Sequence, residues 1–173
     1  MRIVISGLTA MSLEAARAFA ERGDDVILID PDQETFEEVA EDLDIAFIKG
    51  DGARPDILAQ ANPSKVDVMY ALCDGDKDNI IAALVAKAAG IDRVIPKIED
   101  RNYHPICDEI GLTERVDPAH AIARALVHLS GQDAKTPAGL DPDDVARNAL
   151  GQGYEEDPAA RSGGSKQDGY HGA

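Results

Sequence analysis

The chain has 173 residues and a formal net charge of −16 at pH 7. This charge argues against direct binding to nucleic acid or to an anionic membrane, because their phosphate groups would be repelled. No stretch reaches the roughly 20 apolar residues of a membrane-spanning helix, and a strand pattern from residue 2 leaves no room for a signal peptide. The two cysteines, Cys73 and Cys107, lack metal-site or redox spacing, so we expect small buried side chains in a reducing cytoplasm.

Two explanations of the acidity stay open. In a high-salt cytoplasm, surface carboxylates hold water and their mutual repulsion is screened. Alternatively, this is an ordinary acidic protein to which the C-terminal tail adds further charge. Melting curves in molar KCl and in dilute buffer distinguish the two, since destabilisation by salt excludes the first.

Residues 2–30 form the segment around which the chain is organised. An apolar run at residues 3–5 ends in a turn at Gly7, and a helical pattern follows to residue 22. A second β-branched run at residues 26–29 ends on Asp30. A strand, turn, helix and strand ending on an acid are the framework of a dinucleotide-binding βαβ unit.

The glycine motif of such a unit, G-x-G-x-x-G, is incomplete here. Its three positions are Gly7, Thr9 and Ser12, so only the first is glycine. The second glycine normally lets backbone amides approach a pyrophosphate, whereas Thr9 places a Cβ and a methyl group there. A hydroxyl can also donate a hydrogen bond to phosphate, so a binding unit and one that has lost its ligand both remain open.

The remaining elements alternate between strand and helix. We expect strands near residues 45–48, 66–72, 93–98 and 115–117, and helices near 32–43, 55–61, 78–90, 102–110 and 119–130. This alternation predicts an α/β fold, a Rossmann-like doubly wound parallel sheet of about six strands with helices on both faces. A glycine-flanked acid, Gly50-Asp51-Gly52, follows the third strand, at the sheet edge where ligands bind, with a plain turn as the alternative. An acidic turn, Asp74-Gly75-Asp76, follows the fourth strand.

Two helices carry specific expectations. Residues 78–90 are apolar almost all round, which predicts a position in the middle of a packed layer. Residues 119–130 carry a broad apolar stripe that packs either on the sheet of its own domain or on a partner. We expect one domain over residues 1–131 and, over 132–173, an acidic and largely disordered tail with a short helix at 141–150.

An ordered set of segments resembles a known family. RIVISG, VILID ending on Asp30, IKGDGARPDIL and the stretch with Asn79-x3-Ala83 are similar in sequence and order to the TrkA N-terminal domain, also called RCK or KTN. The resemblance covers residues 1 to about 130. It implies a cytosolic regulatory domain that binds NAD(H) or adenine nucleotides and controls a membrane-embedded potassium transporter. It also implies a homodimer or higher oligomer assembled through helix 119–130, at the inner face of the membrane.

The resemblance further implies which residues contact the nucleotide. The phosphates would face the turn after the first strand, and the ribose hydroxyls would bind Asp30. The adenine would lie beside the turn after the third strand. Cys73 stands where the family usually has Thr, and Lys97 where it often has Arg. The implied cofactor-binding set is Gly7, Leu8, Thr9, Ala10, Met11, Asp30, Pro31, Asp51, Gly52, Cys73, Asp74 and Lys97. Ala53 replaces the usual Thr, and about 40 polar residues after the domain are too few for the family's C-terminal ligand domain.

Asp30 also carries a ligand preference on physical grounds. A carboxylate at the end of the second strand accepts hydrogen bonds from both hydroxyls of a ribose and repels a 2′-phosphate. This predicts NAD(H), ATP, ADP or AMP rather than NADP(H). The alternative for Asp30 is a solvated acid that helps to cap the helix beginning near Asp32.

Two other functions stay open beside the regulatory one. An NAD-dependent oxidoreductase remnant would need a catalytic acid or base, and no nucleophile or metal-ligand spacing surrounds the four histidines, His104, His120, His128 and His171. We therefore expect no enzyme activity and no bound metal. A ligand-free interaction module is favoured by Thr9 and Ser12 and opposed by Asp30 and Asp51.

Overall fold

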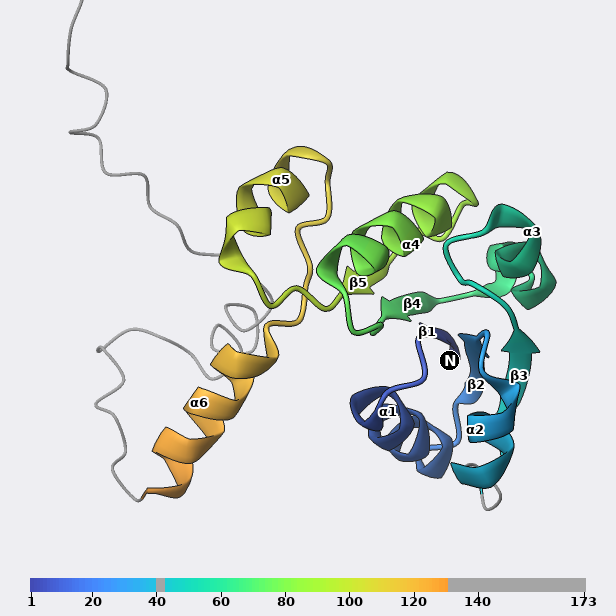
Figure 1. The fold of residues 1–173 in the computed structure, drawn as a ribbon, viewed down its shortest axis with the longest axis horizontal. Coiled ribbons are helices and arrows are strands. Elements are labelled where there is room, and N and C mark those ends of the chain that lie inside the picture. Colours follow the sequence, from blue (N-terminus) through green and yellow to red (C-terminus); the bar gives the residue numbers. More distant parts are fainter. Residues whose placement is uncertain (40–42, 131–173) are drawn as a thin grey trace, which may run out of the picture.

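The computed structural model describes residues 1–39 and 43–130. A sheet of five parallel strands forms its centre, and Figure 1 shows how the helices lie around it. The strand order is β3-β2-β1-β4-β5. This order places β1 in the middle and confirms the doubly wound parallel sheet. The strands are β1 Arg2–Ser6, β2 Asp25–Asp30, β3 Ala46–Lys49, β4 Val68–Ala71 and β5 Val94–Pro96.

The sixth strand is reduced to a single bridge. Val116 pairs in parallel with Lys97, just beyond the end of β5. Pro96 ends β5, so its missing N–H falls at a strand end, one of the positions expected for it. The sheet therefore has five strands with a minimal extension at the β5 edge.

Helices cover both faces of the sheet. The α-helices are α1 Ala10–Glu21, α2 Gln33–Val39, α3 Pro55–Leu58, α4 Asp76–Ala88, α5 His104–Glu109 and α6 Pro118–Leu129. Short 3-10 turns precede or follow them at η1 Ala59–Ala61, η2 Pro63–Lys65 and η3 Arg101–Tyr103. In Figure 1, α1 and α2 lie on one side of the strands and α3 and α4 on the other. Among the described residues, no helix is long and apolar enough to cross a membrane.

β1, β2, β4 and β5 are buried on both faces, which explains their nearly continuous apolar sequences, whereas β3 at the sheet edge is partly exposed. In β1, Ile3 and Ile5 pack in a cluster with Ala16 of α1, whereas Val4 packs in a separate cluster with Ile80 of α4. Side chains of a strand alternate between its faces, so this register assigns each helix layer its own core.

The first turn of α1 shows what replaces the missing glycines. Thr9 is the N-cap: its Oγ1 accepts a hydrogen bond from the Ser12 N–H at 3.1 Å, and the Ser12 Oγ accepts one from the Thr9 N–H at 2.7 Å. This reciprocal pair is a capping box, which stabilises a helix start by about 1 kcal/mol. The two substitutions in the glycine motif thus serve the helix itself.

Helix α4 differs from the expectation of a fully packed layer. Asn79, Ile80, Ala82, Ala83 and Ala86 are buried, but Ile81 is 52% exposed and Leu84 38% exposed. The helix therefore lies in an outer layer with one apolar face open. The apolar sequence failed to predict this because alanines occupy most of the buried face and carry little information about direction.

Helix α6 begins at Asp117, whose Oδ1 accepts a hydrogen bond from the His120 N–H at 2.9 Å. None of its residues is buried, and Ile122, Leu126 and Val127 are 59%, 61% and 49% exposed. Figure 1 shows α6 extending away from the sheet. Of the two expectations for this stripe, packing on the domain's own sheet is not observed. The predicted tail, residues 132–173 with a helix at 141–150, lies outside the described residues.

Candidate functional site

A cleft of about 440 Å³ lies at the carboxyl ends of the strands. In a doubly wound sheet this edge, beside the point where the strand order reverses, is the usual ligand site. The cleft is lined by Ser6 and Gly7 after β1, Ile29, Asp30 and Pro31 at the end of β2, residues 50–53 after β3, Cys73 after β4, and Asp78 and Ile81 of α4. Four strand ends and one helix therefore meet around it.

Two glycines allow the strand ends to approach one another closely. A Cβ on Gly7 would lie 2.6 Å from the backbone nitrogen of Cys73, and Gly7 has a φ of 105°, which side chains rarely adopt. A Cβ on Gly52 would collide with the hydroxyl of Ser6. These contacts bring the turns after β1, β3 and β4 to the same small volume.

Asp30 uses both carboxylate oxygens to hold the surrounding loops. Its Oδ2 accepts a hydrogen bond from the Leu8 N–H at 2.7 Å, and its Oδ1 accepts one from the Asp32 N–H at 2.8 Å. The side chain is half-buried and lines the cleft. Since each carboxylate oxygen has two lone-pair sites, it retains capacity for a ligand hydroxyl. The structure thus shows the loop-capping role and leaves the ribose role geometrically available.

Thr9 does not fill the cleft. Its hydroxyl turns into the helix start and donates to the Leu72 carbonyl at 3.3 Å, and Thr9 is not among the lining residues. Ala10 and Met11 are exposed at the first turn of α1, and their N–H groups have no acceptor among the described residues. The phosphate-facing turn therefore retains two available amides.

Asn79 ties the two neighbouring strand ends together. It is fully buried; its Oδ1 accepts a hydrogen bond from the Cys73 N–H at 2.7 Å, and its Nδ2 donates to the Cys73 carbonyl at 2.9 Å and to the Lys97 carbonyl at 3.0 Å. Because every group of the side-chain amide has a partner, the turn after β4 is held against the end of β5.

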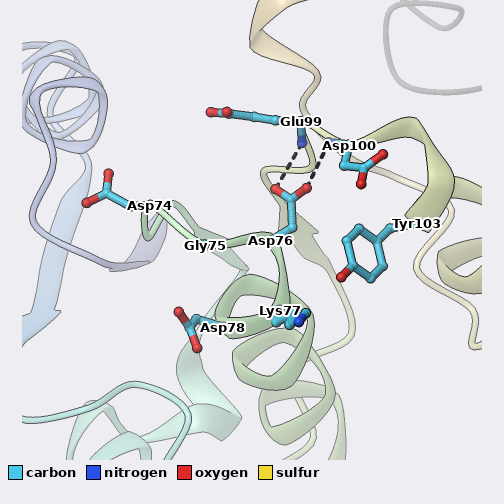
Figure 2. Close-up of a pocket in the computed structure, with 8 residues that line it drawn as sticks. All are labelled: Asp74, Gly75, Asp76, Lys77, Asp78, Glu99, Asp100 and Tyr103. Atoms are coloured by element: carbon cyan, nitrogen blue, oxygen red, sulfur yellow. Dashed lines mark hydrogen bonds between the residues drawn. The ribbon is translucent and has the colours of Figure 1, made fainter.

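A second, more open cleft of about 470 Å³ lies beside the first, over the ends of β4 and β5. Figure 2 shows the Asp76 carboxylate accepting hydrogen bonds from the backbone N–H groups of Glu99 and Asp100, at 3.0 and 2.8 Å. Asp78, in the first turn of α4, lines both clefts. Asp74, one of the expected site residues, lines only this second cleft.

Lys97 does not face the first cleft. Its side chain is 7% exposed and its Nζ lies 2.8 Å from Glu99 Oε1 and 3.4 Å from the Asp74 carbonyl. The expected contact of this cation with a nucleotide is therefore not built into the arrangement of the described residues. Its charge is balanced by Glu99 instead.

Three carboxylates gather around Cys73. Burial raises the pKa of the Cys73 thiol above its ordinary value, and the negative charges of Asp30, Asp78 and Asp51 raise it further, against a lowering contribution from the Ser6 hydroxyl. The thiol lies 3.9 Å from that hydroxyl. A thiol kept protonated among carboxylates has little nucleophilic character at neutral pH.

The sequence located about half of the cleft. Six expected residues line it, namely Gly7, Asp30, Pro31, Asp51, Gly52 and Cys73, whereas Leu8, Thr9, Ala10, Met11, Asp74 and Lys97 are not among its lining residues. Sequence reasoning missed the other six lining residues, Ser6, Ile29, Gly50, Ala53, Asp78 and Ile81. The first four directly precede or follow expected residues, which was an available signal; Asp78 and Ile81 reach the cleft only through the packing of α4.

No metal centre is apparent: the described residues contain no group of three or more His, Cys, Asp or Glu side chains placed to hold an ion. His104 lies in α5, and His120 and His128 lie in α6, away from the cleft lining; His171 falls outside the described residues.

Comparison with known proteins gives one family match. The model of the TrkA-N domain matches residues 3–118. A Trk system potassium uptake protein TrkA homolog of Archaeoglobus fulgidus is 33% identical over 135 residues, covering 76% of this chain and 30% of that protein. A TrkA protein of Streptomyces coelicolor is 29% identical over 113 residues, covering 65% of this chain and 51% of that protein. The chain thus spans a third to a half of the length of these relatives.

Solved structures share the fold at low identity. The TrkA-N domain of the Escherichia coli inner membrane protein YbaL has a TM-score of 0.66 at 15% identity, covering 74% of this chain and 95% of that one. The GsuK channel bound to NAD has a TM-score of 0.63 at 16% identity, covering 72% and 23%. The AMP-bound Kef CTD of Shewanella denitrificans has a TM-score of 0.62 at 18% identity, covering 86% of this chain and 88% of that one. These likenesses establish the fold.

Proposed function

We infer the function from the premise that this chain belongs to the TrkA-N domain family. We propose that it is a regulatory domain that binds NAD(H) or an adenine nucleotide and acts on a potassium-transport membrane protein. The observation that best supports this proposal is the cleft at the carboxyl ends of β1, β2, β3 and β4, with Asp30 at the end of β2. Relatives of this chain are named Trk system potassium uptake proteins, and structures of the same fold hold NAD or AMP.

The geometry supports an adenosine ligand in three places. Asp30 retains lone pairs toward the cleft for ribose hydroxyls, and its charge disfavours a 2′-phosphate. The turn at Asp51 and Gly52 lines the cleft after β3 and is the wall that would contact the adenine. The Ala10 and Met11 amides lie at the positive end of α1, where a phosphate is favoured.

We propose signalling rather than catalysis. The side chains that line the cleft are three carboxylates, the Ser6 hydroxyl, a thiol whose pKa is raised, and apolar groups. None of these pairs a nucleophile with a base. A nucleotide would then act by binding one arrangement of the domain, or of its assembly, more tightly than another.

Helix α6 is the proposed assembly surface, which would bring copies of the domain together in the cytoplasm beside the transporter. Its apolar residues Ile122, Leu126 and Val127 are about half exposed or more, and burying their exposed area would be favourable by roughly 25 cal/mol per Å² of apolar area. Light scattering on the chain tests this: a dimer or larger species that Leu126→Asp converts to a monomer is expected. A monomeric parent chain contradicts the assembly proposal.

Thermal unfolding with NAD, NADH, NADP, ATP, ADP and AMP tests nucleotide binding. A ligand that binds only the folded state raises the melting temperature. We expect a rise with at least one ligand whose adenosine ribose lacks a 2′-phosphate, and a smaller rise with NADP. Asp30→Ala should abolish the ligand-induced shift. Asp25→Ala is the matched control, because Asp25 lies at the opposite end of β2, 58% exposed and paired only with Arg2 at the surface.

The readout is the ligand-induced shift in each variant, since Asp30→Ala also releases the Leu8 and Asp32 amides and lowers the melting temperature by itself. If no nucleotide shifts the melt at millimolar concentration, the binding proposal is wrong and the ligand-free interaction module replaces it. An equal shift in Asp30→Ala and the parent removes Asp30 from the site.

A further inference from the structure

The proposed nucleotide cleft is lined by negative charge alone. Asp30, Asp51 and Asp78 contribute carboxylates from β2, from the turn after β3 and from α4, and no Lys, Arg or His is among its lining residues. All three charges act on one point, since each raises the pKa of the Cys73 thiol in the cleft. A phosphate group entering this volume meets repulsion from three directions.

Two cations that follow strands at this edge of the sheet are already engaged with carboxylates, and Lys49, paired in register with Asp30, is exposed and is not among the lining residues. Arg54, which follows the turn after β3, forms two hydrogen bonds to Asp56, at 2.9 and 3.1 Å. Lys97, which follows β5, pairs with Glu99 at 2.8 Å and is buried. Recruiting either cation to a phosphate would require breaking an existing ion pair.

The backbone cradle for phosphate is also reduced. In the turn after β1, the Leu8 N–H donates to Asp30, and the Thr9 and Ser12 N–H groups are taken by the capping box. Only the Ala10 and Met11 amides remain. Two amides without a cation suit a phosphodiester, which carries a single charge on each phosphate, better than a terminal phosphomonoester, which carries about −1.5 to −2.

We propose that this cleft selects adenosine ligands by low phosphate charge, so that NAD⁺ and adenosine bind in preference to ADP and ATP. This inference rests on the proposed nucleotide-binding function and names the ligand class of that site. NAD⁺ has a diester pyrophosphate and a positively charged nicotinamide ring, and adenosine has no phosphate. ADP and ATP bring a multiply charged terminal group into the field of the three cleft carboxylates, Asp30, Asp51 and Asp78.

Isothermal titration calorimetry with adenosine, NAD⁺, ADP and ATP, in low-salt buffer without divalent cations, tests the selection. We expect NAD⁺ and adenosine to bind about tenfold or more tightly than ADP and ATP. The preference should shrink as ionic strength rises, because salt screens partly exposed charges.

Charge-removing variants locate the cause. Asp51→Asn and Asp78→Asn keep the side-chain shape and should each improve ADP binding severalfold relative to NAD⁺. Asp92→Asn makes the same change in an exposed residue before β5, at the amino-terminal edge of the sheet, and should leave the ratio unchanged.

The outcomes separate the two proposals. If none of the four ligands binds, the proposed function fails and this selection fails with it. If ligands bind but ADP or ATP binds as tightly as NAD⁺, the charge selection is overturned while nucleotide binding stands. The charge selection is also overturned if the preference for NAD⁺ over ADP is as large in Asp51→Asn and Asp78→Asn as it is in Asp92→Asn.

Discussion

Replacing Asn79 by Ala should strongly destabilise the fold, because this one side chain satisfies three buried backbone groups. Its amide binds the N–H and carbonyl of Cys73 and the carbonyl of Lys97, at 2.7, 2.9 and 3.0 Å, and it is completely buried. A hydrogen bond contributes about 1 kcal/mol net, and a buried group left unpaired costs about 1–3 kcal/mol. The change should therefore lower the free energy of unfolding by about 3–5 kcal/mol.

Urea denaturation followed by circular dichroism measures this loss. Small domains have m-values of about 1–3 kcal/mol per molar urea, so the unfolding midpoint should fall by about 2 M. Asn102→Ala is the matched control: Asn102 is exposed, and its side chain makes a single hydrogen bond, to Asp100 at 2.8 Å. The control should lower the free energy of unfolding by no more than about 1 kcal/mol.

Asn79→Asp adds a test whose sign depends on pH. The protonated acid keeps an acceptor for the Cys73 N–H and one donor, whereas the ionised form faces two carbonyls in a buried site, which raises its pKa. A raised pKa means that stability is retained at acidic pH and lost as pH rises. The proposed role of Asn79 in joining the ends of β4 and β5 would be refuted by either of two results. One is a loss of unfolding free energy below about 1 kcal/mol in Asn79→Ala, and the other is an Asn79→Asp variant that is equally stable at pH 4 and pH 8.

Two further predictions concern the cleft walls. Gly52→Ala should destabilise the protein by about 1–3 kcal/mol because its Cβ collides with Ser6. Gly75→Ala is the control and should cost much less, because its Cβ meets only the movable end of Asp78, at 2.7 Å. Urea unfolding midpoints compare the two variants, and equal losses of stability contradict the contact between Gly52 and Ser6. Burial and the nearby carboxylates raise the pKa of the Cys73 thiol, so its alkylation by iodoacetamide at pH 8 should be slower in the folded chain than in the urea-unfolded chain. The rate in the folded chain should increase only at higher pH. Peptide mass spectrometry measures the rate, and equal rates in the folded and unfolded chains would be inconsistent with a raised pKa.

Sequence periodicity predicted the fold well because each element carries its own local signal. The β-branched runs of β1 and β2, the turn at Gly7 and the terminal Asp30 predict a βαβ unit by themselves. The alternation of strands and helices then limits the topology, since crossovers between parallel strands are right-handed. The weakest strand, around Val116, survived only as one bridge with Lys97 because so short a segment makes few ladder hydrogen bonds.

The candidate site was predictable only where it consists of strand ends. Gly7, Asp30, Asp51 and Cys73 follow strands and converge because parallel strands end at one edge. Lys97 follows a strand as well, yet its side chain turns toward Glu99. That direction depends on which charge lies nearest in space, and a sequence pattern carries no such information.

The sequence by itself determined the order of elements, the strand-end acids and the amphipathic character of the last helix, because these follow from local spacing and residue type. Tertiary structure alone decided that Asp78 and Ile81 of α4 reach the cleft, that Asn79 joins the ends of β4 and β5, and that α6 keeps its apolar face exposed. Each of these depends on contacts between segments distant in the chain, whose geometry is set only when the helices pack on the sheet.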